Sequence, residues 1–259
     1  MLKCVFVKTR SDYHMPMTRD APAASARSGE DSPAGLDLDA LYDTRFSRED
    51  RQKKDAIWAV LCSEFFQRYV GPSDTVMDIG AGLGEFLRHI RCGKRIAVDL
   101  SPMRGRILPA GTIEINVPSD RLDDHVPADS VDIVFCSNFF EHLPDKATFL
   151  ATLRAIRTVL KPGARLLVLQ PNIRVLGGQY WDFVDHHLPL TDRTLVEASH
   201  MLGFEVVENV PRFLPYTTRS RLPQTPWLVK VYLRCRPAWW LFGGQAWFVA
   251  RKPAHSPGA

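Results

Sequence analysis

The sequence predicts an α/β protein built on a seven-stranded, mostly parallel sheet with helices on both faces and an antiparallel last strand. Short apolar runs alternate with segments whose apolar residues recur at helical spacing. This alternation is typical of a parallel sheet that is covered on both sides. A cluster of glycines directly follows the first apolar run, at the place where such sheets bind ligands.

Length and composition limit the possible classes of protein. The chain has 259 residues, with 33 Lys and Arg, 29 Asp and Glu, and 45% hydrophobic residues, which suits one large domain and excludes wholesale disorder. No apolar stretch reaches the ~20 residues of a membrane-spanning helix. The apolar run in residues 1–10 is short and has no clear small-residue cleavage site, so we do not expect it to act as a secretory signal. The five cysteines form no CxxC pair, so we expect a reducing, cytoplasmic setting without disulfides or a zinc site.

The chain divides into three parts. Residues 1–35 have no sustained apolar period, and we interpret them as a flexible leader. Residues 36–70 form an N-terminal helical cover, because apolar residues recur at helical spacing from about residue 50. Residues 71–259 form the main domain, with a lid inserted at 211–243.

The elements of the main domain follow in order. Glycine and proline residues mark the boundaries between the apolar runs. Helices are expected after the glycine cluster, over 149–160, over 191–202 with Thr191 as N-cap, and over 227–236. The expected strands are 75–79, 95–99, 112–117, 131–136, 165–169, 204–210 and 245–250. Strands and helices in this order predict a Rossmann-like domain.

The glycine cluster predicts a binding site for an adenosine cofactor. Asp78 ends the first strand, and Gly80, Ala81, Gly82 and Gly84 follow it. Glycines allow a sharp turn and a close approach to the main chain, and the next helix presents free N–H groups. An acid about 20 residues further on, at Asp99, suits the two hydroxyls of a ribose. The GxGxG spacing, followed by a glutamate, differs from the GxGxxG of dinucleotide-binding proteins.

Several segments resemble class I S-adenosylmethionine-dependent methyltransferases. Residues 76–84, VMDIGAGLG, resemble motif I of that family. Residues 129–143, DSVDIVFCSNFFEHL, are similar to its fourth-strand motif, and residues 161–167, KPGARLL, to its turn into strand five. The resemblance covers about residues 71–210, and residues 245–251 match the final antiparallel strand.

This resemblance implies a methyltransferase that uses S-adenosyl-L-methionine. Gly80 and Gly82 would then lie against the methionine part of the cofactor, Asp99 would bind the ribose, and Asp120, or alternatively Asn116, would contact the adenine. The expected cofactor-binding residues are Asp78, Gly80, Ala81, Gly82, Gly84, Asp99, Leu100, Asp120, Ser137 and Asn138.

Methyl transfer requires that the nucleophile of the acceptor is aligned with the methyl group. If the nucleophile is a hydroxyl or an amine, a base must also remove its proton. His142, His186 and His187 are the candidate bases, because they follow strands four and five and the last two stand beside an acid. The sulfonium is already an activated leaving group, so we expect no metal. Tyr180, Trp181 and Phe183 are candidates for an aromatic substrate wall or for simple packing.

The C-terminal part is basic and aromatic. From Arg212 to Lys252 it contains eight Lys or Arg, no acid and four of the six Trp. Residues 212–242 are therefore candidates for peripheral contact with an anionic membrane, for holding a lipid-linked acceptor, or for a packed lid; nucleic acid is less favoured. Residues 180–191 and 213–216 also resemble bacterial methyltransferases of glycan assembly.

We therefore predict methyl transfer to an oxygen or nitrogen of a small-molecule, glycan-like or lipid-linked acceptor. Two alternatives stay open. One is an NAD-dependent oxidoreductase, which the loop spacing disfavours. The other is a non-catalytic cofactor-binding protein that docks at membranes through Trp239 and Trp240. The oligomeric state does not follow from the sequence.

Overall fold

The computed structural model describes residues 48–100, 105–216 and 225–254. The expected leader, 1–35, and the first part of the cover, 36–47, lie outside these residues. Seven strands form one sheet in the order β3-β2-β1-β4-β5-β7-β6. Their bounds are β1 Thr75–Ile79, β2 Lys94–Val98, β3 Ile113–Ile115, β4 Val131–Ser137, β5 Leu160–Pro171, β6 Glu205–Pro215 and β7 Gly243–Arg251.

The pairing of the strands confirms the predicted topology. β1 pairs in parallel with both β2 and β4, while β7 is antiparallel to both of its neighbours, β5 and β6. The strand order changes direction between β1 and β4, since the chain first winds outward to β3 and then returns. In such sheets ligands bind outside the carboxyl ends of the strands at this switch point.

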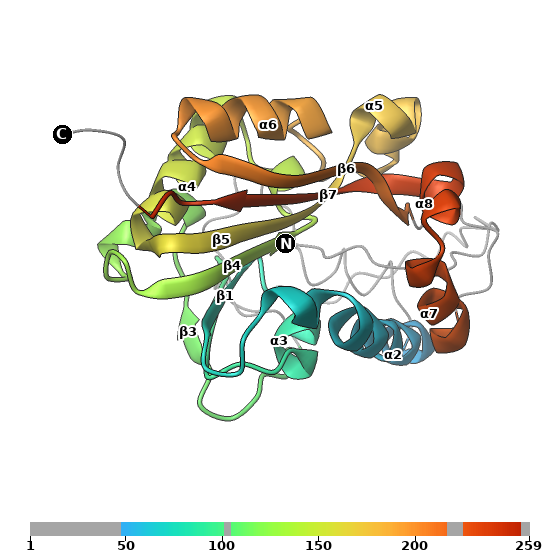
Figure 1. Ribbon diagram of the computed structural model, residues 1–259, viewed down its shortest axis with the longest axis horizontal. Helices are drawn as coiled ribbons and strands as arrows, with labels where there is room; N and C mark the ends of the chain where they lie inside the picture. Colours follow the sequence, from blue (N-terminus) through green and yellow to red (C-terminus); the bar gives the residue numbers. More distant parts are fainter. Residues whose placement is uncertain (1–47, 101–104, 217–224, 255–259) are drawn as a thin grey trace, which may run out of the picture.

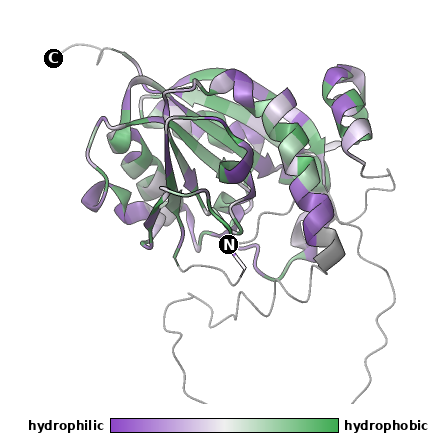
Figure 2. Cartoon of the chain, turned by 90° about the horizontal axis from the view of Figure 1, so that it is seen from below, coloured by the Kyte–Doolittle hydropathy of each residue, from purple (hydrophilic) through white to green (hydrophobic). Residues whose placement is uncertain are grey.

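Helices cover both faces of the sheet, as predicted (Figure 1). One face packs against α4 (Lys146–Val159) and α6 (Asp192–Met201). The other packs against α2 (Arg48–Glu64), the short 3-10 helix η1 (Phe66–Tyr69) and α3 (Glu85–His89). In Figure 2 the central strands are mostly hydrophobic, whereas the covering helices carry both hydrophobic and hydrophilic turns.

The helical cover is held to the sheet by a cluster of aromatic rings. Trp58 of α2 and Phe66 of η1 are fully buried and contact Phe86 of α3 and Phe135 of β4. The rings of Phe86 and Phe135 stack with their centroids 3.9 Å apart. Because large aromatic side chains bury much apolar area, this cluster fixes α2 beside the glycine loop.

The segment between strands six and seven differs from the expected lid over 211–243. Residues 211–215 belong to β6, which accepts Pro211 and Pro215 because it is the edge strand of the sheet. After it come α7 (Pro226–Arg234), close to the expected helix, and α8 (Arg236–Phe242). Trp239 of α8 is buried against the Phe213 ring, 4.8 Å away. The described part of the segment is therefore mainly two packed helices.

Candidate active site

The glycine loop connects β1 to α3 in a conformation that requires glycine. Gly80, Gly82 and Gly84 have φ values of +68°, +55° and +82°, a region that other residues rarely adopt. A Cβ on Gly80 would lie 2.6 Å from the ring of Phe139. The amides of Gly80 and Ala81 both donate to the carbonyl of Val98, so the loop is tied to the end of β2.

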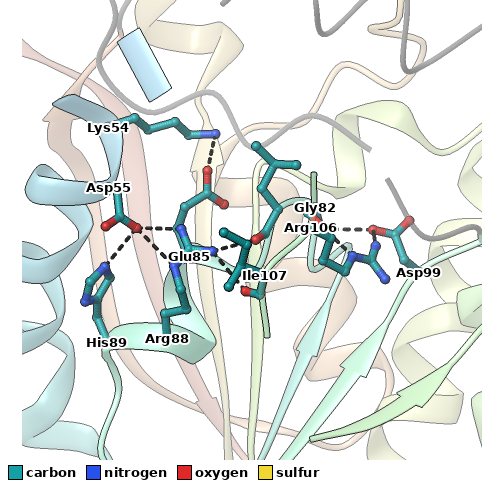
Figure 3. Close-up of polar contacts among 10 residues, drawn as sticks. Lys54, Asp55, Gly82, Glu85, Arg88, His89, Asp99, Arg106 and Ile107 are labelled. Atoms are coloured by element: carbon teal, nitrogen blue, oxygen red, sulfur yellow. Dashed lines mark hydrogen bonds and ion pairs between the residues drawn. The ribbon is translucent and has the colours of Figure 1, made fainter. Parts of the chain in front are cut away.

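Asp99 lies beside this loop, as the sequence predicts. Its carboxylate accepts hydrogen bonds from the amides of Gly82, at 2.9 Å, and Leu100, at 3.0 Å. Arg106 adds an ion pair of 2.9 Å to Asp99 and donates from Nε to the carbonyl of Gly82 at 2.7 Å (Figure 3). The carboxylate, only 2% exposed, is thus oriented by the loop and by one guanidinium. A ribose would share this carboxylate with Arg106.

Ion pairs also connect the helical cover to the loop. Lys54 of α2 reaches Glu85, the first residue of α3, with 2.9 Å between Nζ and Oε1 (Figure 3). Asp55 pairs with Arg88 and His89 of the same helix. Burial raises the pKa of Asp55, but the hydrogen bonds from Arg88 and His89 outweigh this effect and hold it below its usual value. The two ion pairs thus join α2 to α3, and the pair between Lys54 and Glu85 is buried.

The other expected cofactor residues lie around the same edge of the sheet. Asp78 is buried in β1, and Ser137 and Asn138 are buried at the end of β4. The hydroxyl oxygen of Ser137 has no hydrogen-bond partner among the described residues, so a polar group of a bound cofactor would satisfy it. Asp120 lies half-buried in the 3-10 helix η2 (Ser119–Asp124), and its adenine contact stays a prediction.

Two of the three candidate bases meet next to this edge. His142, in the 3-10 helix η3 (Phe140–His142), and His186 lie with Glu141 so that one ligand atom of each falls within 4.8 Å of the others. The Nε2 atom of His142 is 3.9 Å from Oε1 of Glu141. Glu141 and His186 are 1% and 5% exposed, and the side chain of His142 is 7% exposed. We call Glu141, His142 and His186 the His–Glu cluster.

Hydrogen bonds fix the orientation of both imidazole rings. Nδ1 of His142 lies 2.8 Å from the carbonyl oxygen of Asp185 and 3.4 Å from its carboxylate. Nδ1 of His186 lies 2.8 Å from the carbonyl oxygen of Tyr180. Because a carbonyl oxygen only accepts, each Nδ1 carries the proton, and in the neutral ring Nε2 carries the lone pair. Asp185, in the loop after β5, thus contacts His142, which lies 43 residues earlier in the sequence.

Glu141 is the acid of the His–Glu cluster. Gln170, at the end of β5, donates to its Oε2 at 3.0 Å. Burial raises the pKa of Glu141 to about 8, and the nearby charge of Asp185 adds to the effect. The backbone carbonyl of Glu141 accepts from the amides of His187 and Leu188. These two backbone hydrogen bonds hold the loop after β5 against the loop after β4.

The remaining expected residues of this region have different surroundings. The side chain of His187 is exposed, so the structure places it apart from the buried cluster. The Phe183 ring stacks on His186, with centroids 5.0 Å apart. Tyr180 is fully buried, whereas Trp181 is 50% exposed. Tyr180 and Phe183 therefore position His186, and only Trp181 is free to form a wall toward solvent.

The fold is that of an α/β protein with a glycine loop and a buried acid, Asp99, at the switch point of its sheet. A family model described as a methyltransferase domain matches residues 45–209. The chain therefore belongs to this methyltransferase family. Among curated proteins, none matches the chain by sequence.

Solved structures show the same fold. One is a chain in the complex of the Haloferax volcanii Trm112 methyltransferase activator with a methyltransferase. It is 21% identical to the present protein, with a TM-score of 0.61, and the match covers 84% of the present protein and 98% of the solved chain. A SAM-dependent methyltransferase from Archaeoglobus fulgidus is 22% identical, with a TM-score of 0.57 and coverages of 82% and 99%. One from Mesorhizobium loti is 18% identical, with a TM-score of 0.51 and coverages of 76% and 97%.

The protein is thus a class I methyltransferase, an enzyme whose cofactor is S-adenosyl-L-methionine. The residues present fit this cofactor: Asp99 offers a carboxylate for a diol, and the buried hydroxyl of Ser137 lacks a partner among the described residues. The cofactor supplies an activated methyl group. The family match sets aside the nicotinamide-dependent alternative.

Several residues of the site are not predicted by the sequence. Asp185 is only the acid that precedes His186, and Glu141 is only one letter of the motif at residues 129–143. Arg106, Lys54 and Gln170 carry no local signal, because each reaches its partner across the fold. The sequence did signal Glu141, however, through its place directly before His142 at the end of a predicted strand.

Proposed function

We propose that this methyltransferase transfers the methyl group to a hydroxyl oxygen of a small polar acceptor of the glycan type. The observation that carries the proposal is the His–Glu cluster. Glu141 and His142 of this cluster follow β4, and Phe139 of the same loop lies against Gly80 of the glycine loop. This contact supports a position of the cluster near the glycine loop, where we expect the methyl donor to bind.

The chemistry of the cluster suits a hydroxyl nucleophile. A hydroxyl attacks a sulfonium methyl effectively only when its proton is removed in the transition state. Two imidazoles oriented through Nδ1, with the lone pair on Nε2, are groups that accept such a proton. Gln170 adds a buried carboxamide oxygen without a hydrogen-bond partner among the described residues. This polar lining favours an acceptor with several hydroxyls over an apolar one.

The proposal is tested with S-adenosylmethionine that carries a ¹³C-labelled methyl group. The full chain is incubated with free sugars, nucleotide sugars and lipid-linked saccharides, and ¹³C NMR separates O-methyl from N-methyl products. We expect an O-methyl product, formed about 10²- to 10⁴-fold more slowly by His142→Ala, which is the range for loss of acid–base catalysis.

His187→Ala is the matched control, because His187 neighbours His186 but its side chain is exposed. It is expected to retain the wild-type rate. A labelled methyl found on nitrogen or carbon, or a His142→Ala rate equal to that of the wild type, would contradict the proposal.

We also propose that α7 and α8 contact an anionic membrane surface. Trp227 and Trp240 are 69% and 72% exposed, and Leu241 is 61% exposed. No acid occurs between Arg212 and Lys252. A pocket of about 720 Å³ beside α8 is lined by three arginines and one acid, Arg174, Arg212, Arg236 and Glu208, together with apolar residues. Exposed aromatics and cations together suit anionic headgroups. Within the described residues, no helix is long and apolar enough to cross a membrane.

Vesicle binding tests this second proposal. The double variant Trp227→Ala/Trp240→Ala is expected to lose most of its binding to vesicles that contain phosphatidylserine, since both rings are exposed. Trp181→Ala is the matched control, because this exposed tryptophan lies on the 3-10 helix η4 (Gly177–Asp182). Trp239 is unsuitable for the test because it is buried. Unchanged vesicle binding by the double variant would refute the membrane contact.

A further inference from the structure

The His–Glu cluster has the geometry of a metal site. The candidate ligand atoms of Glu141, His142 and His186 lie within 4.8 Å of one another. Ligands about 2.1 Å from one ion lie about 3.0–3.4 Å apart in octahedral or tetrahedral geometry. The 3.9 Å between Nε2 of His142 and Oε1 of Glu141 exceeds this spacing by about 0.5–0.9 Å. The Glu141 carboxylate would therefore move toward the fixed rings to share one ion with them.

The surroundings of both histidines match those of metal ligands. A ligating histidine usually donates its second ring N–H to a carboxylate or a backbone carbonyl, which fixes the ring and raises the basicity of the ligating nitrogen. His142 makes this contact with the carbonyl of Asp185, and His186 makes it with the carbonyl of Tyr180. The stacked ring of Phe183 further restricts His186. Because Nδ1 of each ring is turned to a backbone carbonyl, Nε2 is the atom that would ligate an ion.

The carboxylate also has an oxygen available. Oε2 of Glu141 accepts from Gln170, whereas Oε1, which faces His142, accepts no hydrogen bond from another described residue. A buried acceptor without a partner is costly and rare in folded proteins. Asp185 places a second buried carboxylate beside His142. A cation in the cluster would satisfy Oε1.

We propose that Glu141, His142 and His186 bind one divalent transition-metal ion. Two imidazoles and one carboxylate favour ions such as Mn²⁺, Fe²⁺, Co²⁺ or Zn²⁺ over Mg²⁺ or Ca²⁺. Three protein ligands leave positions for water or substrate, as in catalytic rather than structural sites. The inference rests on the proposed function and changes the role of the imidazoles from proton acceptors to ligands. The ion would bind the acceptor hydroxyl and lower its pKa, so that the hydroxyl proton passes to solvent. The new O–CH3 bond would form as the bond between the methyl carbon and the sulfonium sulfur breaks, and S-adenosylhomocysteine leaves.

Cobalt binding tests the site without any acceptor. The purified full chain is treated with a chelator, dialysed and titrated with Co²⁺, and the visible absorption reports nitrogen and oxygen coordination. We expect one ion per chain. His186→Gln and Glu141→Gln are expected to weaken its binding at least 100-fold, and Asp185→Asn, which acts through His142, about 10- to 100-fold. A rise in thermal midpoint with Co²⁺, in the wild type only, gives a second readout.

His187→Gln is the matched control, since it removes a neighbouring exposed imidazole, and its Co²⁺ affinity is expected to equal that of the wild type. Absence of one-to-one binding in the wild type would overturn the inference. Equal affinity in folded His186→Gln and Glu141→Gln would do the same, because the ion would then lie elsewhere.

The metal inference and the proposed function fail separately. An O-methyl product formed at the full rate after chelation refutes the ion and leaves the function intact. A bound ion together with a methyl group on nitrogen or carbon leaves the metal site intact and refutes the hydroxyl acceptor.

Discussion

Replacing Asp99 with alanine is expected to weaken binding of S-adenosylhomocysteine by about 10- to 150-fold for each hydrogen bond that the cofactor loses. This range corresponds to about 1.5–3 kcal/mol for a hydrogen bond to a charged group. The loss has a second source, because Asp99 also accepts the amide of Gly82 and so holds the glycine loop. Isothermal titration calorimetry measures the effect directly, and a parallel titration with NAD is expected to show no binding.

Glu114→Ala is the control for this measurement. Arg106 pairs with Asp99 at 2.9 Å and also with Glu114 at 3.4 Å. The side chain of Glu114 is 46% exposed, whereas that of Asp99 is buried. Glu114→Ala therefore perturbs the same guanidinium from its outer side and is expected to bind the cofactor product within about twofold of the wild type. Wild-type affinity in Asp99→Ala would rule out the role of this carboxylate in cofactor binding.

Breaking the buried pair between Lys54 and Glu85 is expected to have the largest effect on stability. Both side chains are at most 3% exposed, and their charged atoms are 2.9 Å apart. Removing one partner leaves the other charge buried without this counter-ion, which costs about 3–5 kcal/mol. Lys54→Met should lower the free energy of unfolding by this amount, as measured by urea denaturation followed by circular dichroism.

Two further variants make this result interpretable. Lys54→Met/Glu85→Met removes both charges, and it is expected to recover most of the lost stability because apolar replacements of buried pairs are often neutral. Asp55→Ala removes the neighbouring, 40% exposed partner of Arg88, and should cost no more than about 1 kcal/mol. A loss below 1 kcal/mol in Lys54→Met would show that the pair does not hold α2 to α3.

The amino-acid sequence by itself determined the sheet and the cofactor loop. The central strands β1 and β4 are short apolar runs, TVMDI and VDIVFCS, and these are local signals that tertiary contacts here reinforce. β5 and β6 extend beyond their apolar runs, since Leu160–Pro171 and Glu205–Pro215 include polar residues and proline. The loop from Gly80 to Gly84 could be located because its positive φ values restrict the residue type. Asp99 could be located because the end of the second strand is fixed relative to the first.

Only the tertiary structure decided which side chains meet. The sequence places Asp185 beside His186, yet the fold pairs it with His142, 43 residues away. It likewise brings Lys54 to Glu85 and sets His186 inside the cluster while the next residue, His187, faces solvent. Such choices depend on how loops from different strands pack together, and periodicity along one chain carries no information about that packing.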